Sequence, residues 1–201
     1  MIRAVYFDFG GVLIRDEDNS EREVWEKRLG LSPGELAAIV FESEAAGRAS
    51  VGEITTAEVW RQIGERLQLD AEQCRQLQAN FFRGDNLNVE LLEFAGALRP
   101  QYKLAILSNA WSGARQVFSQ VYGLDAVFET MIISAEVGLA KPDPRIYHLA
   151  VERLDARPEE AIFLDDRLEN IEAAQAVGLR AVHFRDNAQA IAEVRAYLDA
   201  G

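Results

Sequence analysis

The 201-residue sequence predicts an α/β protein in which a doubly wound parallel sheet carries a small inserted all-helical segment. The first observation is that short apolar runs alternate with segments whose apolar residues recur at helical spacing. The second is a stretch near the N-terminus that lacks convincing strands and holds several helix-start signatures. Alternation of strand and helix is typical of βαβ units, whose strands lie parallel in one sheet.

The apolar runs bounded by turn residues are expected to form buried strands, because their length and flanking residues fit strands better than helices. These runs are residues 2–9, 103–107, 131–134, 161–164 and 180–184. The helical patterns follow them along the chain, at residues 89–98, 114–121, 144–154, 168–177 and 188–198.

The alternation is interrupted between the first and second predicted strands, where we expect a helical cap. Pairs of residues three positions apart match the capping-box pattern of helix N-termini. The pairs are Ser20 with Glu23, Ser32 with Glu35, Ser50 with Glu53, Thr55 with Glu58, and Asp70 with Gln73. The predicted organisation is therefore an α/β core of residues 1–15 and 86–201 and a helical cap of residues 16–85.

The composition argues against several classes of function. Lys and Arg number 21 against 33 Asp and Glu, and the resulting net charge of −12 repels nucleic acid and anionic lipid. No apolar run approaches the length of a membrane span, and the first strand lacks the features of a signal peptide. The single cysteine, Cys74, excludes an intrachain disulfide framework. We therefore expect a soluble, cytoplasmic protein that binds neither nucleic acid nor membrane.

Polar and charged residues stand at the carboxyl ends of four predicted strands. Ligands bind at this edge of an open parallel sheet, because loops and helix N-termini converge there. Each residue taken alone could equally be a turn former, a helix cap or a solvated side chain. The residues are Asp8 after the first strand, Ser108 and Asn109 after the second, Lys141 beyond the third, and Asp165 with Asp166 after the fourth.

Three carboxylates at one sheet edge point to a divalent cation, because they cannot all stay ionised at close range without one. Mg²⁺ prefers oxygen ligands and keeps coordination positions for water and phosphate. Lys141 adds a positive charge, and the Ser108 hydroxyl can donate to phosphoryl oxygens. In such a site Asp8 is either a metal ligand or a nucleophile that forms an acyl phosphate.

These residues resemble motifs of the haloacid dehalogenase-like hydrolases, in the subgroup with a helical cap inserted after the first strand. The matching segments span the chain in the order typical of that family. They are Phe-Asp-Phe-Gly-Gly-Val-Leu at 7–13, Leu-Ser-Asn at 107–109, Lys-Pro-Asp-Pro-Arg-Ile-Tyr at 141–147, and Phe-Leu-Asp-Asp at 163–166 followed by Asn170.

The resemblance implies a Rossmann-like core, a Mg²⁺ cofactor and a role for each matched residue. Asp8 is implied as nucleophile and metal ligand, and Ser108 and Lys141 as catalytic groups that also bind the substrate phosphate together with Asn109. The implied metal ligands are Asp8, the Gly10 carbonyl, Asp165 and Asp166.

The sequence departs from the family pattern at Gly10, where related phosphatases usually carry the aspartate that acts as general acid and base. Loss of such a group typically costs about two to four orders of magnitude in rate. Asp16, Glu17 and Asp18 are candidate substitutes, because they lie where the chain enters the predicted cap.

The favoured interpretation is a Mg²⁺-dependent phosphatase that hydrolyses a small phosphorylated metabolite, with a sugar phosphate among the candidates, through an aspartyl-phosphate intermediate. One alternative is a phosphate-binding or regulatory protein without turnover, which Gly10 favours. Haloacid dehalogenation is less favoured, because that chemistry needs no metal and the Asp165–Asp166 pair indicates one. The sequence leaves the substrate and the oligomeric state open.

Overall fold

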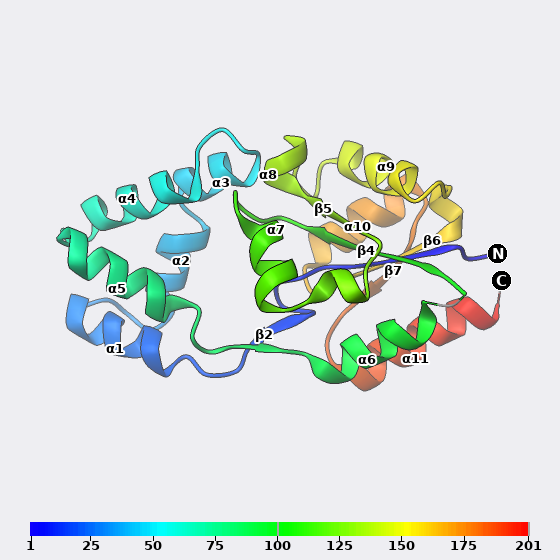
Figure 1. Cartoon of the computed structure of the whole chain (residues 1–201), viewed down its shortest axis with the longest axis horizontal. Helices are drawn as coiled ribbons and strands as arrows, with labels where there is room; N and C mark the ends of the chain where they lie inside the picture. Colours follow the sequence, from blue (N-terminus) through cyan, green and yellow to red (C-terminus); the bar gives the residue numbers. More distant parts are fainter. Residues whose placement is uncertain (100, 201) are drawn as a thin grey trace.

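The computed structural model describes residues 1–99 and 101–200 and contains the predicted doubly wound parallel sheet (Figure 1). The strand order is β5-β4-β1-β6-β7, and all neighbours in this sheet pair in parallel. The strands are β1 (Ala4–Phe7), β4 (Lys103–Ser108), β5 (Thr130–Ile133), β6 (Ala161–Asp165) and β7 (Arg180–His183). β4 and β5 lie on one side of β1, and β6 and β7, which come later in the chain, lie on its other side. The strand order therefore reverses at β1, and ligands bind at such a switch point in open parallel sheets.

Helices cover both faces of the sheet, because successive side chains of a strand point to opposite faces. Val5 and Phe7 of β1 enter one apolar core, and Ala4 and Tyr6 enter the other. The first core is covered by α6 (Val89–Leu98), α11 (Asn187–Asp199) and the π-helical turn η1 (Val117–Val121), and the second by α9 (Pro144–Arg153) and α10 (Leu168–Val177). Shorter elements are α7 (Ala114–Gln116), η2 (Leu124–Ala126), α8 (Ser134–Val137) and η3 (Pro158–Glu160).

A lobe of five helices lies to one side of the sheet (Figure 1). The helices are α1 (Ser20–Leu29), α2 (Glu35–Phe41), α3 (Glu44–Ser50), α4 (Thr56–Arg66) and α5 (Ala71–Phe81). They share a third apolar core, which is built around Trp25, Trp60 and Leu77. The extent of the cap as a domain, residues 16–85, stays a prediction. No helix among the described residues is long and apolar enough to cross a membrane.

A short antiparallel ribbon joins the helical lobe to the core, where the sequence indicated no strand. It consists of β2 (Ile14–Asp16) and β3 (Asp85–Leu87). Asp16 pairs with Asp85 in the strand register, and the Arg22 guanidinium forms ion pairs with both carboxylates. Strands this short carry too little apolar periodicity to be recognised, so the ribbon depends on the tertiary contacts that hold its two segments together.

Only two of the five predicted capping boxes cap a helix. The Asp70 carboxylate and the Gln73 side chain each accept from the other's backbone N–H, and the Thr55 hydroxyl accepts from the N–H of Glu58. The other three predictions are wrong. Ser20 is already inside α1, Ser32 precedes the N-cap Gly34, and Ser50 ends α3. Residue spacing alone cannot tell which serine has the extended backbone that an N-cap needs.

The helical lobe contacts the core at a second place, remote from the ribbon along the chain. The backbone N–H of Thr56, at the start of α4, donates to the Ser112 hydroxyl at 3.0 Å, and the Thr56 hydroxyl donates to the Ser112 carbonyl at 2.6 Å. Ser112 lies in the loop after β4, at the carboxyl edge of the sheet. These bonds hold one side of the lobe against the sheet edge that carries the predicted site.

Candidate active site

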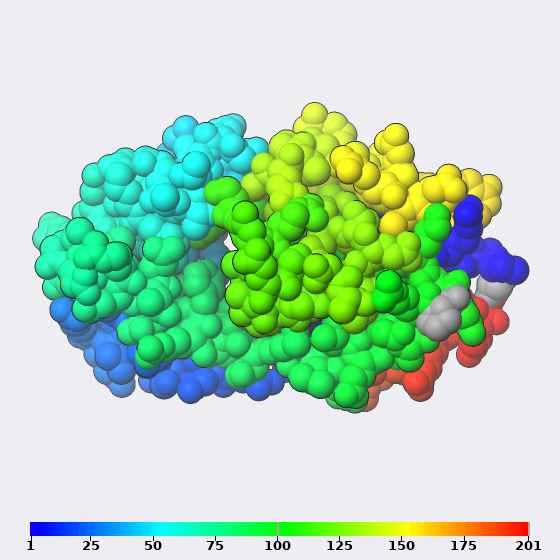
Figure 2. Space-filling view, in the orientation of Figure 1, coloured from blue at the N-terminus to red at the C-terminus, as the bar shows by residue number. Residues whose placement is uncertain are grey.

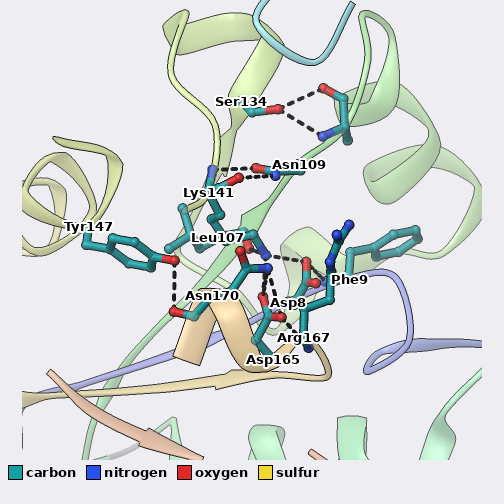
Figure 3. A network of polar contacts seen from close by, with 11 residues as sticks. Asp8, Phe9, Leu107, Asn109, Ser134, Lys141, Tyr147, Asp165, Arg167 and Asn170 are labelled. Atoms are coloured by element: carbon teal, nitrogen blue, oxygen red, sulfur yellow. Dashed lines mark hydrogen bonds and ion pairs between the residues drawn. The ribbon is translucent and has the colours of Figure 1, made fainter. Parts of the chain in front are cut away.

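Four of the residues predicted from the sequence, Asp8, Asn109, Lys141 and Asp165, meet at the carboxyl edge of the three central strands, β4, β1 and β6 (Figure 3). Asp8 directly follows β1, Ser108 ends β4 and Asp165 ends β6. Asp8, Ser108 and Asp165 are buried, whereas Asp166 is exposed. One carboxylate oxygen from each of the three aspartates lies within 4.8 Å of the other two.

Lys141 is the cation around which this group is arranged. Its ammonium Nζ lies 2.9 Å from Asp8 Oδ1 and 2.7 Å from Asp165 Oδ2, and it donates to the Leu107 carbonyl at 2.9 Å. The side chain is 1% exposed. The buried ammonium thus has two hydrogen bonds, to Leu107 and Asp165, and an ion pair with Asp8, which together match its three N–H donors.

Asn109 fixes the backbone of Lys141. Its side-chain Nδ2 donates to the Lys141 carbonyl at 2.8 Å, and its Oδ1 accepts from the Lys141 N–H at 2.8 Å (Figure 3). The sequence predicts Asn109 as a substrate-binding residue, and in the structure both ends of its amide are engaged by Lys141. We therefore propose that Asn109 acts by positioning Lys141 beside Asp8.

Asp165 is held from several sides and is fully buried. Its Oδ1 accepts from the Arg167 N–H at 2.8 Å and from Asn170 Nδ2 at 3.0 Å, and its Oδ2 accepts from Lys141 and from Asn170 Nδ2 at 3.1 Å. Tyr147 donates to the Asn170 carbonyl at 2.9 Å and so fixes the start of α10. Since these donors already occupy Asp165, we propose that it positions Lys141, and that Asp8 and Asp166 are the carboxylates open to a metal.

The pKa values of both open carboxylates are raised. Burial raises the pKa of Asp8 to about 7, and the nearby Asp165 carboxylate adds to the rise, although Lys141 acts in the opposite direction. Asp166 is exposed as a residue, but partial loss of hydration at its carboxyl group, together with the Asp165 charge, also raises its pKa. One ammonium does not neutralise three carboxylates, so the site has an excess of negative charge that a cation relieves.

The donor set fits Mg²⁺ in chemistry and in spacing. All candidate ligands are oxygens, which Mg²⁺ prefers, and two oxygens on opposite sides of one Mg²⁺ lie about 4.2 Å apart. The aspartate oxygens lie within 4.8 Å of one another, so small side-chain movements bring them to that span. Among residues 1–99 and 101–200, the buried Asn170 Oδ1 has no hydrogen-bond partner, and a water in a metal's hydration shell is a suitable donor for it.

Gly11 is a structural requirement of the site that sequence reasoning did not identify. Its φ angle is +74°, and a Cβ atom there would lie 2.2 Å from Asp166 Oδ2. Only glycine therefore allows the loop after β1 to approach Asp166 this closely. The signal in the sequence is the Gly10–Gly11 pair directly after a buried strand. By contrast, a Cβ atom at Gly10 would have nothing within 4 Å.

Asp16, Glu17 and Asp18, the candidate substitutes for the missing acid and base, lie at the end of β2 and directly after it. Asp16 forms an ion pair with Arg22, and Asp18 accepts from the Ser20 N–H at 2.9 Å. Both carboxylates thus have local structural partners where the chain enters the helical lobe. Neither carboxylate forms a hydrogen bond or ion pair with Asp8, Lys141 or Asp165.

We expect Gly11→Ala to weaken Mg²⁺ binding by on the order of tenfold or more, because the new methyl group displaces Asp166. Isothermal titration calorimetry with Mg²⁺ measures the effect. Gly123→Ala is the matched control, because Gly123 also has a positive φ, +64°, but has nothing within 4 Å of its Cβ position. Equal Mg²⁺ affinity in the two variants would contradict the proposed role of Asp166.

We expect Asp8 to lower the free energy of unfolding of the metal-free protein as the pH rises from about 4 to about 7. The unfolded chain releases the Asp8 proton near pH 3.8, whereas the folded chain keeps it up to about pH 7. Between these values the folded state binds more protons, so it loses stability as the pH rises. Denaturant unfolding at several pH values measures this slope. We expect Asp8→Asn to reduce this slope of unfolding free energy against pH. The control Asp125→Asn, which changes an exposed aspartate, leaves the slope unchanged. Identical slopes in the two variants would argue against the raised pKa of Asp8.

Comparison with curated proteins finds relatives of different overall length. The chain is 33% identical over 114 residues to bifunctional epoxide hydrolase 2 of Rattus norvegicus, a match that covers 54% of the chain and 21% of that protein. It is 26% identical over 207 residues to sesquiterpene phosphatase astK of Aspergillus oryzae, covering 96% of the chain and 95% of the relative. It is 25% identical over 187 residues to D-ribitol-5-phosphate phosphatase of Bacteroides thetaiotaomicron, covering 89% of each.

Solved structures with the same fold include proteins of different chemistry. A haloacid dehalogenase family enzyme of Bacteroides thetaiotaomicron, in complex with magnesium and inorganic phosphate, matches with a TM-score of 0.77 at 23% identity over 92% of this chain and 95% of that one. L-2-haloacid dehalogenase of Xanthobacter autotrophicus, with chloropropionic acid covalently bound, matches with a TM-score of 0.66 at 23% identity over 90% and 76%. The fold is common to both and does not choose between their reactions.

The family relationship rests on a match along most of the chain. The family model of the haloacid dehalogenase-like hydrolases matches residues 2–178, which include every residue of the site described above. The chain therefore belongs to the haloacid dehalogenase-like hydrolase family.

Proposed function

We propose that the protein is a Mg²⁺-dependent phosphatase that hydrolyses small phosphoric monoesters through an aspartyl-phosphate intermediate. The observation that carries the proposal is the position of Asp8, held by Lys141 in a cluster with two further carboxylates at the switch point of the sheet. Two full-length relatives named as phosphatases support it. The paired aspartates after β6 favour this function over dehalogenation, which needs no metal.

The geometry at Asp8 supports Oδ2 as the oxygen that acts as the proposed nucleophile. Among the described residues, the Phe9 N–H, at 2.7 Å, and the Lys141 ammonium both bind Oδ1. Oδ2 is therefore the oxygen free to attack phosphorus. As the Oδ2–P bond forms, the bond from phosphorus to the ester oxygen breaks, and the alcohol leaves with a proton from water. A second water then attacks phosphorus, releases phosphate and restores the Asp8 carboxylate.

The other site residues stabilise charge and fix geometry. Lys141 offsets the charge that builds up on the transferring group, and the Ser108 hydroxyl donates to a phosphoryl oxygen. The Gly10 carbonyl, Asp8 and Asp166 are proposed to hold Mg²⁺, with Asp165 nearby in the same acidic group. When bound, Mg²⁺ supplies positive charge that draws the phosphate to an otherwise negative site and polarises its oxygens.

The helical lobe is proposed to act as the cap over this site. It is joined to the core by the β2–β3 ribbon and contacts the loop after β4 through Thr56 and Ser112. A cap in this position limits the entry of water and contacts the alcohol portion of the substrate. The names of these relatives indicate substrates with very different alcohol portions, a sesquiterpene and D-ribitol, so they leave the substrate open. The sugar phosphate considered from the sequence stays one candidate.

A second candidate function is phosphate binding without turnover, and Gly10 is the observation that favours it. The position where related phosphatases carry an acid and base has no side chain here. A good leaving group needs little protonation, so an activated ester distinguishes a slow catalyst from a protein that only binds.

We expect the protein to hydrolyse p-nitrophenyl phosphate in the presence of Mg²⁺, and Asp8→Asn to lower kcat by on the order of 10⁴-fold or more, because the amide cannot attack phosphorus. Release of p-nitrophenol is the measurement. Asp125→Asn, which changes an exposed aspartate of η2, is the matched control and retains activity. Mg²⁺-dependent hydrolysis by Asp8→Asn would refute the nucleophile, and no hydrolysis by the natural protein that still binds phosphate would favour the second candidate.

We expect Gly10→Asp to raise kcat for alkyl phosphates by about 10²–10⁴-fold, because the new carboxyl can protonate a poor leaving group. The position accepts a side chain, since nothing lies within 4 Å of its Cβ. Hydrolysis of p-nitrophenyl phosphate changes much less. Gly10→Asn, which has the same size and no acid, is the control; an equal gain from both variants would show that acid catalysis is not the cause.

A further inference from the structure

Five aromatic side chains from distant parts of the sequence form one continuous cluster. Phe41 contacts both Phe82 and Trp111, with ring centroids 6.4 and 6.2 Å apart. Phe81 lies beneath them, 5.4 Å from Phe41 and 5.0 Å from Phe82. Trp60 completes the group, 5.8 Å from Phe81 and 6.3 Å from Phe82.

The cluster has a buried layer and an exposed layer. Trp60 and Phe81 are 3% and 1% exposed and belong to the apolar core of the helical lobe. Phe41 and Phe82 are 50% and 40% exposed, and Trp111 is half-buried. The buried rings are explained by the packing of the lobe. The exposed rings are not, because they keep large apolar surfaces in water, which is typical of a ligand-binding surface.

The exposed layer approaches the proposed catalytic site through Trp111. Trp111 is three residues beyond Ser108, so its Cα is at most about 11 Å from that of Ser108. The next residue, Ser112, binds the start of α4. Phe82 follows the end of α5 that points toward the core in Figure 1. Figure 2 shows a narrow gap between the helical lobe and the segment around α7.

The charged residues near the motifs do not offer a site for a second anionic group. Arg115, Arg145 and Arg167 are each paired with an acidic side chain, Glu136, Asp143 and Glu169 respectively. With a net charge of −12, the chain gains affinity for a substrate from one phosphate at the metal site and not from further negative charge.

Resting on the proposed phosphatase function, we propose that Phe41, Phe82 and Trp111 bind the alcohol portion of the substrate, and that this portion is largely hydrocarbon. Stacked and edge-on ring contacts favour an apolar chain or ring. A polyol would leave hydroxyl groups against these rings without hydrogen-bond partners, which costs affinity. The substrate class is therefore an apolar phosphoric monoester, with the phosphate at Asp8 and the hydrocarbon on the lobe.

The test measures binding separately from catalysis. Alkyl phosphates have poor leaving groups, and their slow hydrolysis would mask a gain in binding affinity. Ethyl-, butyl-, hexyl- and octylphosphonate are compared as competitive inhibitors of Mg²⁺-dependent p-nitrophenyl phosphate hydrolysis, at concentrations below micelle formation. A fully buried methylene group contributes up to about fourfold in affinity. We expect the inhibition constant to fall by about tenfold or more from ethyl- to octylphosphonate, and a hydroxylated phosphonate of octyl length to bind no better than the ethyl compound.

Substitution of the exposed rings identifies the surface responsible. Phe41→Ala and Phe82→Ala each reduce the octyl-to-ethyl ratio, and the double variant lowers it below about threefold, since the lost ring area no longer covers the chain. Val24→Ala removes an apolar side chain of α1 that is even more exposed and lies outside the cluster, and it leaves the ratio unchanged. Circular dichroism and thermal unfolding establish that each variant is folded.

The outcomes separate this proposal from the proposed function. Hydrolysis of p-nitrophenyl phosphate with inhibition constants that do not depend on chain length overturns the apolar substrate class and leaves the phosphatase standing. A ratio that is the same in Phe41→Ala, Phe82→Ala and the natural protein overturns the assignment to this cluster. If p-nitrophenyl phosphate is not hydrolysed, the phosphatase fails, and calorimetric binding of the same phosphonates in Mg²⁺ still decides whether the cluster binds hydrocarbon.

Discussion

The structure depends on one buried ammonium placed between two buried carboxylates. Lys141 binds Asp8 and Asp165 at hydrogen-bond distance, and all three groups lie inside the protein. Burying charges is costly unless they are paired and hydrogen-bonded, so the elements that bring them together must be held accurately. Asn109 holds the Lys141 backbone in place through two hydrogen bonds, and Asn170 holds Asp165 by donating to its carboxylate. Packing of β4, β1 and β6 in one sheet is what brings these contributions within reach of each other.

This ion-pair arrangement also explains why we propose a further cation at the site. Lys141 offsets only part of the charge of Asp8, Asp165 and Asp166. Burial, with a smaller contribution from the Asp165 charge, raises the pKa values of Asp8 and Asp166. A phosphate dianion would be repelled by that excess. A divalent ion offsets that excess charge, which makes metal binding and phosphate binding interdependent in the proposed function.

The fold and the chemistry are determined at different levels. The same core is found in solved structures of a magnesium- and phosphate-bound enzyme and of a haloacid dehalogenase, so the sheet supports more than one reaction. In this chain the proposed reaction depends on a few side chains at the sheet edge, and the proposed substrate class on rings of the helical lobe. The lobe has its own apolar core, which allows its surface to vary without disturbing the sheet.

The sequence by itself determined the α/β fold and the aspartates of the site, because a charged residue at the end of a buried apolar run is a local signal. Asp8 and Asp165 could be located this way. Contacts between distant segments were decided only in the tertiary structure: the ribbon of β2 and β3, the approach of Gly11 to Asp166, and the aromatic cluster assembled from residues 41–111. Local periodicity contains no information on which distant segments meet, and Ser20 and Ser50 show that even a local capping pattern fails when the backbone conformation is set by packing.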